Sequence, residues 1–347
     1  NALNLSTTAS NNTAVGMHAL YANTTGTENV AVGMASLDNC DVGSENTAIG
    51  KSALGNDTKG SRSTAVGNSA LQTQNFTSAT NAYNSAFGFN AGGAVTTGLR
   101  NTLIGAKAGD TITTGGDNVA VGANALTANT TASSNTAVGS SALLANTTGT
   151  RNTAVGANAL DASTTANYNS AFGTHAGSSI TTGSLNSVFG DYALAGTTTG
   201  DGNSAFGQAA LGLNTTGHSN TAVGKVSLYS NTQGLRNTAL GFNAGGGITN
   251  GDDNTMIGIY AGNHAVGTTT GNQNTLIGAQ TRADSAGSGQ TVAIGYDVAG
   301  TGGYTTLGNA GSDIRALHGN ITWATVSDER YKKDIVDSTA GLSFINA

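Results

Sequence analysis

The chain repeats a short pattern of apolar positions with a fixed period. The phrase Asn-Thr-Ala-Val-Gly, or a close variant, recurs along almost the whole chain, and we call its last residue the anchor glycine. The interval between anchors is 17 residues in fourteen of sixteen cases. The anchors are Gly16, Gly33, Gly50, Gly67, Gly88, Gly105, Gly122, Gly139, Gly156, Gly173, Gly190, Gly207, Gly224, Gly241, Gly258, Gly278 and Gly295. Such a period is typical of a solenoid, in which each repeat forms one coil stacked on the previous one.

The residues before each anchor predict one short strand per coil. The residue directly before the anchor is always Val, Ile, Leu or Phe, and the residue two before is Ala in thirteen copies. Neighbouring strand residues point to opposite faces, so both faces of every strand are apolar. We therefore expect an all-β fold over residues 1–300, a parallel β-solenoid (β-roll) of about 17 coils. At about 4.8 Å per coil this rod is on the order of 80 Å long.

Three further positions of the repeat predict the rest of the coil. Four residues after the anchor stands Leu, as in Leu160, or a second Gly, as in Gly177. We expect the Leu to fill the coil interior, and a larger apolar residue before the anchor, such as Phe172, to compensate where Gly replaces it. Asn stands four residues before the anchor in fifteen of seventeen copies. Stacking these side chains predicts an amide ladder that holds the register.

The second face of the strands predicts an interface between copies. A narrow coil covers one strand face, and the other carries mostly Ala, which permits close approach of another backbone. The larger residues Leu103, Val188, Met256 and Leu276 on that face favour its burial. We therefore expect a homotrimer that packs Ala faces such as Ala137, Ala154 and Ala171 around a common axis.

Composition narrows the classes of function. Charged residues are 9% of the 347 residues and the net charge is −6, so nucleic acid is not an expected partner. No run of 18 apolar residues exists, and we expect no membrane insertion. The five histidines lack metal-ligand spacing and no phosphate-binding loop is present, so no cofactor is expected. The single cysteine, Cys40, is interpreted as a small residue inside one coil.

Two irregular intervals predict outward loops. The interval from Gly67 to Gly88 is 21 residues and that from Gly258 to Gly278 is 20. We place the extra residues within 72–81 and 263–271, because a packed coil cannot accept them without losing register. The residues expected to contact a receptor there are Gln72, Asn75, Phe76, Asn81, Asn263 and His264.

The coils of residues 11–300 resemble the heads of trimeric bacterial adhesins, whose repeats carry a Ser/Asn-x-Ala-Ile-Gly strand. They are also similar to repeats of phage tail fibres. The resemblance implies a homotrimeric structural and receptor-binding protein that contacts a glycan or protein on the host cell surface. An ice-binding solenoid is a weaker alternative, since the recurring Thr-Thr pairs abut a turn glycine.

The C-terminal segment changes character. After Gly295 the period fails, and residues 301–326 form a junction in which Tyr304–Gly308 is a degenerate last copy. Six of the nine residues from Ser327 to Ile335 are charged. This stretch resembles the opening of the intramolecular chaperone domain of phage tailspikes and tail fibres, which places the truncated start of such a domain at residues 327–347. Because the chain begins at Asn1 and stops at Ala347, we expect a fragment of a longer protein.

That resemblance implies trimerisation of the fibre and then self-cleavage between Val326 and Ser327. Ser327 would be the nucleophile and Lys332 the base that activates it, as a weak hydroxyl nucleophile requires. The alternative is a charged strand that leads into a trimeric bundle without cleavage. The segment favours a tail fibre on a virion, which also contacts other tail proteins, over a bacterial surface adhesin.

Overall fold

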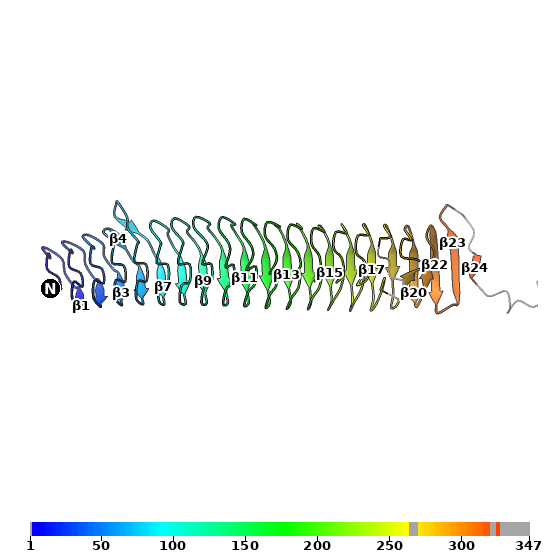
Figure 1. Cartoon of the computed structure of the whole chain (residues 1–347), viewed down its shortest axis with the longest axis horizontal. Helices are drawn as coiled ribbons and strands as arrows, with labels where there is room; N and C mark the ends of the chain where they lie inside the picture. Colours follow the sequence, from blue (N-terminus) through cyan, green and yellow to red (C-terminus); the bar gives the residue numbers. More distant parts are fainter. Residues whose placement is uncertain (1, 264–269, 320–323, 327–347) are drawn as a thin grey trace, which may run out of the picture.

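The computed structural model describes residues 2–263, 270–319 and 324–326. In this part the chain winds into a long rod of stacked coils, with β-strands and no helix (Figure 1). The strands of one large parallel column recur every 17 residues, which confirms the all-β parallel solenoid of about 17 coils.

The large sheet contains β1 (Thr13–Val15), β2 (Val30–Val32), β3 (Thr47–Ile49), β5 (Thr64–Val66), β7 (Ser85–Phe87), β8 (Thr102–Ile104), β9 (Val119–Val121), β10 (Thr136–Val138), β11 (Thr153–Val155), β12 (Ser170–Phe172), β13 (Ser187–Phe189), β14 (Ser204–Phe206), β15 (Thr221–Val223), β16 (Thr238–Leu240), β17 (Thr255–Ile257), β18 (Thr275–Ile277), β20 (Val292–Tyr296), β22 (Tyr304–Asn309), β23 (Asp313–Leu317) and β24 (Ala324–Val326). Two small parallel pairs accompany it, β4 (Gly60–Ser61) with β6 (Thr80–Asn81) and β19 (Arg282–Ala283) with β21 (Ala299–Gly300).

Equivalent residues of successive coils lie directly opposite one another. Ala154 of β11 pairs with Ala137 of β10 on one side and with Ala171 of β12 on the other. The register is therefore set by the repeat itself, and each side-chain type forms a row along the rod.

The C-terminal end of the rod closes by reversing the chain. β22 still pairs in parallel with β20, with Gly308 opposite Gly295, so Tyr304–Asn309 is a further, degenerate copy. β23 then runs antiparallel to β22, and β24 antiparallel to β23. These two strands cover the edge that a last parallel coil would leave unpaired.

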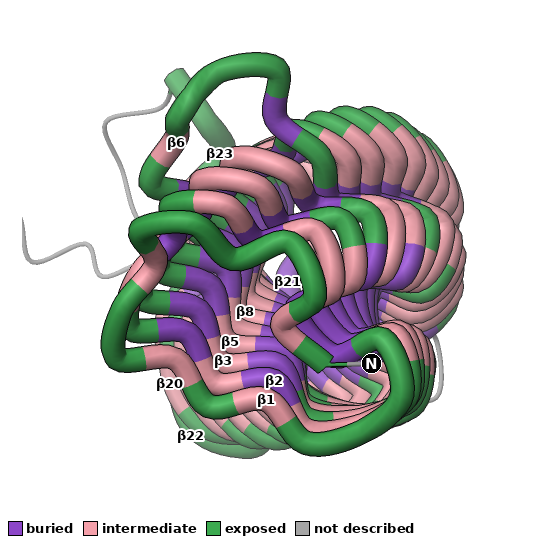
Figure 2. Tube along the Cα trace, turned by 90° about the vertical axis from the view of Figure 1, so that its left-hand side faces the viewer, coloured by how far each residue is buried: buried purple, intermediate pink, exposed green. Residues whose placement is uncertain are grey.

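The Ala face lies inside the coil, which corrects the predicted interface. Buried stretches recur at the same place in every coil when the rod is viewed end-on (Figure 2). Ala137, Ala154 and Ala171 are fully buried within a single chain. The coil is so narrow that its interior accepts Ala opposite the Leu four residues after the anchor. The larger Val, Ile and Phe residues before the anchors lie on the outer strand face instead.

The predicted exchange of volume between core positions also requires correction. Phe172 is 36% exposed, so it cannot compensate for Gly177 in the interior. The compensating residue is Ile180, which is fully buried three residues after that glycine. A Cβ added to Gly177 would lie 2.9 Å from Ile180 Cδ1. Coils with Leu at the first of these positions carry a polar residue or Cys at the second, as Leu143 and Asn146 do.

Large residues on the Ala face serve the same exchange. Leu103 is buried between the glycines of two coils. A Cβ on Gly92 would lie 2.6 Å from Leu103 Cδ1, and one on Gly109 would lie 2.8 Å from Leu103 Cδ2. Leu103 thus fills space inside its own chain and gives no support to packing between copies.

A double-mutant cycle at Gly177 and Ile180 tests this exchange. Ile180→Asn alone leaves a void beside Gly177, and Gly177→Leu alone overfills the coil. We expect each to lower the free energy of unfolding by about 2–3 kcal/mol. The double variant recreates the Leu and Asn pair of other coils, so its cost is expected to be at least about 2 kcal/mol below the sum. Additive costs in chemical denaturation would contradict the exchange.

The asparagine ladder is confirmed. The backbone N–H of Asn152 donates to Asn135 Oδ1 at 2.9 Å, and Asn152 Nδ2 donates to the Ala166 carbonyl at 2.7 Å. These buried amides join each strand to the turn of the next coil. Cys40 is also buried, with Sγ 3.5 Å from the Gly43 carbonyl oxygen. Burial raises the pKa of its thiol to about 12, so it is a structural residue.

Candidate binding surfaces

The first irregular interval leaves the coil as a loop, as predicted. It projects from the N-terminal third of the rod beside β4 (Figures 1 and 2). Parallel pairing resumes where Thr80 lies opposite Gly60 and Asn81 opposite Ser61. The extra residues therefore lie within 77–81.

The residues predicted to contact a receptor at this loop occupy different environments. Asn75 and Asn81 are exposed, and Gln72 is half-buried at a regular coil position. Asn75 Oδ1 accepts a hydrogen bond from Thr58 Oγ1 at 2.8 Å. Phe76 is only 5% exposed, so it anchors the base of the loop instead of presenting a contact surface.

The remaining predicted site residues lie at or beyond the limits of the described residues. Asn263 is half-buried, and its backbone N–H donates to the Tyr260 carbonyl at 3.1 Å. His264, Ser327 and Lys332 lie outside the described residues.

A buried polar network under the loop was missed by the sequence analysis. Ser63 replaces the ladder asparagine here, and Gln74 bridges the gap. Gln74 Nε2 donates to Asp57 Oδ2 at 2.5 Å and to Ser63 Oγ at 3.1 Å, while its Oε1 accepts from Asn84 Nδ2 at 2.8 Å. Burial raises the pKa of Asp57, and the Gln74 hydrogen bond opposes that rise. The sequence signal was the coincidence of a ladder break with an insertion.

Gln74→Ala is expected to destabilise the loop-bearing coils by about 2–3 kcal/mol, because it leaves the buried Asp57 carboxylate short of a donor. The Asp57 pKa in the folded state then rises further above its ordinary value. The loss in unfolding free energy should therefore be larger near pH 7 than near pH 4, where Asp57 is protonated. Denaturant titration at both pH values measures it. Gln72→Ala is the control, with an expected change within about 0.5 kcal/mol; equal effects of the two variants would contradict the bridging role.

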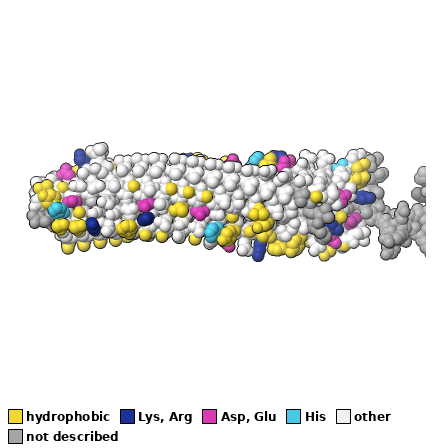
Figure 3. Space-filling view, viewed as in Figure 1, with side chains coloured by type: hydrophobic (Ala, Val, Ile, Leu, Met, Phe, Trp, Pro, Cys, Tyr) yellow, Lys and Arg dark blue, Asp and Glu magenta, His cyan; other side chains and the backbone are white. Residues whose placement is uncertain are grey.

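The outer strand face forms an uncharged apolar surface along the rod. In all seventeen coils the residue before the anchor is Val, Ile, Leu or Phe, and the residue three before is Thr, Ser or Val. Phe172, Phe189 and Phe206 are 36–38% exposed and stack on one another, with ring centroids 4.8 and 4.9 Å apart. In Figure 3 hydrophobic side chains gather along the lower edge of the rod, and charged side chains are few. We call this row of residues before the anchors the apolar strand face.

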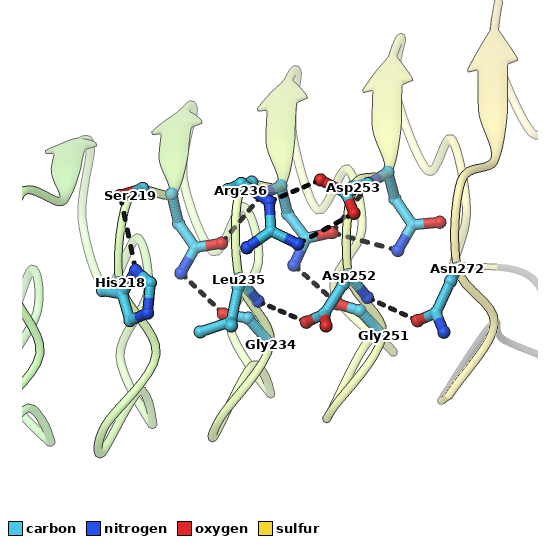
Figure 4. A network of polar contacts seen from close by, with 12 residues as sticks. His218, Ser219, Gly234, Leu235, Arg236, Gly251, Asp252, Asp253 and Asn272 are labelled. Carbon is cyan, nitrogen blue, oxygen red and sulfur yellow. Dashed lines mark hydrogen bonds and ion pairs between the residues drawn. The ribbon is translucent and has the colours of Figure 1, made fainter.

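Charged residues pair from coil to coil in the turn before the strands. Arg236 Nε lies 2.6 Å from Asp253 Oδ1, and Arg100 makes the same contact with Asp117 (Figure 4). Hydrogen bonds from the arginines lower the pKa of Asp117 and of Asp253. These pairs are solvent-exposed and add little stability, but they select the register of neighbouring turns.

The same turn carries a second ladder on the residue before the charged one. The Leu235 backbone N–H donates to Asp252 Oδ1 at 2.8 Å, and the Asp252 N–H donates to Asn272 Oδ1 at 2.7 Å (Figure 4). Side-chain oxygens thus extend the hydrogen bonding of the coils where the strand has not yet begun.

The recurring Thr-Thr pairs do not form a flat array of free hydroxyls. The first threonine of a pair donates to the carbonyl of the next coil, as Thr113 Oγ1 does to Thr130 at 2.9 Å. Only the second, such as Thr114, is exposed, and the pairs lie in bends. This geometry disfavours the ice-binding alternative.

Comparisons with family models, curated proteins and solved structures found no significant match. Among the described residues, no group of three or more His, Cys, Asp or Glu side chains is placed to hold a metal ion. The same residues contain no helix long and apolar enough to cross a membrane.

Proposed function

We propose that this chain is the shaft of a homotrimeric viral tail fibre that attaches to a host cell surface. The observation that carries the proposal is the apolar strand face, which runs along the whole rod without a charged residue. Its alternative assignment is a trimeric bacterial surface adhesin built from the same kind of coil.

The apolar strand face supports association of copies side by side. Exposed apolar surface of this extent on a soluble protein marks an interaction site. A three-fold axis along the rod brings the same coil of each copy together, so every phenylalanine row meets an identical row. The ion pairs such as Arg236–Asp253 lie in the turns, away from this face, and remain compatible with it. The proposed interface thus replaces the Ala face by the opposite face of the same strands.

The charged segment after Val326 supports a fibre over an adhesin. Its resemblance to the opening of a tail-fibre chaperone domain has no counterpart among surface adhesins, which end in a membrane anchor. The reading frame beyond Ala347 distinguishes the two: a chaperone domain is expected for a fibre, and a membrane-barrel anchor would assign the chain to the adhesins.

Light scattering tests the assembly. We expect a particle of three times the chain mass of 34.0 kDa. Phe189→Asp places a charge on each copy at the proposed axis and should dissociate the particle while leaving the coils folded. A monomer for the unsubstituted chain would refute the trimer. Fluorescently labelled protein should bind saturably to cells within a panel of bacterial strains; absence of binding throughout the panel would reject attachment.

Self-cleavage is a separate prediction for the full-length protein. It should release a C-terminal fragment that begins at Ser327, as detected by mass spectrometry. Ser327→Ala should abolish release, and Lys332→Ala should slow it about a hundredfold or more, since a positioned base is lost. An unprocessed wild-type protein would leave the segment as a trimerisation junction only.

A further inference from the structure

A column of aromatic side chains on the rod surface is interrupted at one coil. The column occupies the second residue after the anchor, where His175 and Tyr192 stack with ring centroids 4.7 Å apart and planes tilted by 13°. The next coil carries Ala209 at this position. One face of the Tyr192 ring is therefore covered by His175, while the other faces a rung that has no ring.

The gap is a pocket with a second aromatic wall. Its volume is about 350 Å³, within the range of small-molecule sites, and its lining includes Tyr192, Gln208, Ala209, Gly212 and Tyr229. Tyr229 lies over Gly212, since a Cβ on that glycine would be 2.8 Å from Tyr229 Cε2. Two small residues thus form the floor between two tyrosines, and we call this pocket the tyrosine slot.

Polar groups lie at the edge of the tyrosine slot. Gln208 lines it, is exposed, and its amide has no protein partner within the described residues. Asp191 and Lys225 occupy the same position after the anchor in the two flanking coils. Other coils mostly carry Ala, Met, Phe or Ile there, so three long polar side chains in a row coincide with the slot.

We infer that the tyrosine slot binds one pyranose ring of a cell-surface glycan, an inference that rests on the proposed host attachment and names the chemistry of its receptor. The apolar C–H face of a sugar ring packs on an aromatic face, and it would take the place of the missing rung against Tyr192. The Gln208 amide offers both a donor and an acceptor to ring hydroxyls. Because a pyranose combines one apolar face with a rim of hydroxyls, it matches aromatic walls and a polar edge together.

Saturation-transfer NMR on the intact chain tests the slot, with the methyl pyranosides of glucose, galactose, mannose and N-acetylglucosamine as probes. We expect saturable binding of at least one probe, with the strongest transfer to protons of its apolar face. Tyr192→Ala should weaken that binding about tenfold or more, the loss of one stacked wall. Tyr168→Ala is the matched control, since both tyrosines are 49% exposed and Tyr168 lies in another turn; its affinity should be unchanged.

Ala209→Tyr fills the slot with a ring from the protein. Ala209 and Tyr192 share the same backbone conformation, with φ of +53° and +54°, so the substitution is compatible with the fold. It should abolish pyranoside binding without lowering the melting temperature. Absence of binding by every probe, or equal loss in Tyr168→Ala, would overturn the inference. Indole binding that depends on Tyr192, in the absence of pyranoside binding, would overturn it in favour of a purely aromatic pocket.

Cell attachment separates this inference from the proposed function. If Ala209→Tyr loses sugar binding and cell attachment together, the slot is the receptor contact. Full attachment of Ala209→Tyr would overturn the slot as receptor site and leave the fibre assignment intact. Failure of the unsubstituted chain to attach to cells would overturn the proposed function, which the sugar titration does not test.

Discussion

Ala154→Asp is expected to unfold the coils around it, with a loss of about 3–5 kcal/mol for an uncompensated buried charge. Ala154 is fully buried and lies in register between Ala137 and Ala171, so the carboxylate would face only apolar side chains and backbone. Circular dichroism during heating and hydrogen exchange of β10–β12 measure the loss.

Val155→Asp is the matched control, because the neighbouring side chain points to the opposite face of the strand. It should leave the β-structure intact while weakening the association of copies. If Ala154→Asp instead dissociated copies without unfolding the coils, the assignment of the Ala face to the interior would be wrong.

Gly156→Ala is expected to cost about 3 kcal/mol and to disrupt stacking on the next coil. The anchor glycine has a φ of +140°, which residues with a Cβ rarely adopt. A Cβ there would also lie 2.3 Å from the carbonyl oxygen of Gly173, the next anchor, and backbone cannot yield as a flexible side chain would. Chemical denaturation gives the difference in unfolding free energy.

Gly202→Ala provides the comparison. Gly202 also has a positive φ, of +64°, but the only atom near an added Cβ is Ser219 Oγ at 4.0 Å. Arg236 adopts a similar conformation at the equivalent position, with a φ of +54°. The cost should stay below about 1 kcal/mol. Equal costs at Gly156 and Gly202 would show that close packing of the anchors does not determine the stability of the stack.

The candidate surfaces were only partly predictable. The insertion after Gly67 had to leave the coil, because four extra residues break a 17-residue register wherever they are placed. Gln74 and Asp57 could not be joined from the sequence, since the rotamer that bridges them depends on the geometry of the ladder break. The tyrosine slot follows from the coil register, which aligns Tyr192, Ala209 and Gly212, together with the lean of the Tyr229 ring, which only the structure shows.

The sequence by itself determined the architecture, because a period repeated seventeen times leaves one way to stack identical strands and asparagines. It did not determine which strand face is inside. Ala154 and Val155 are both apolar, so the hydrophobic pattern is satisfied with either face inward. The tertiary structure decided this through width: the opposite wall of the coil lies so close that Ala fits beside Leu160, whereas Val and Phe do not.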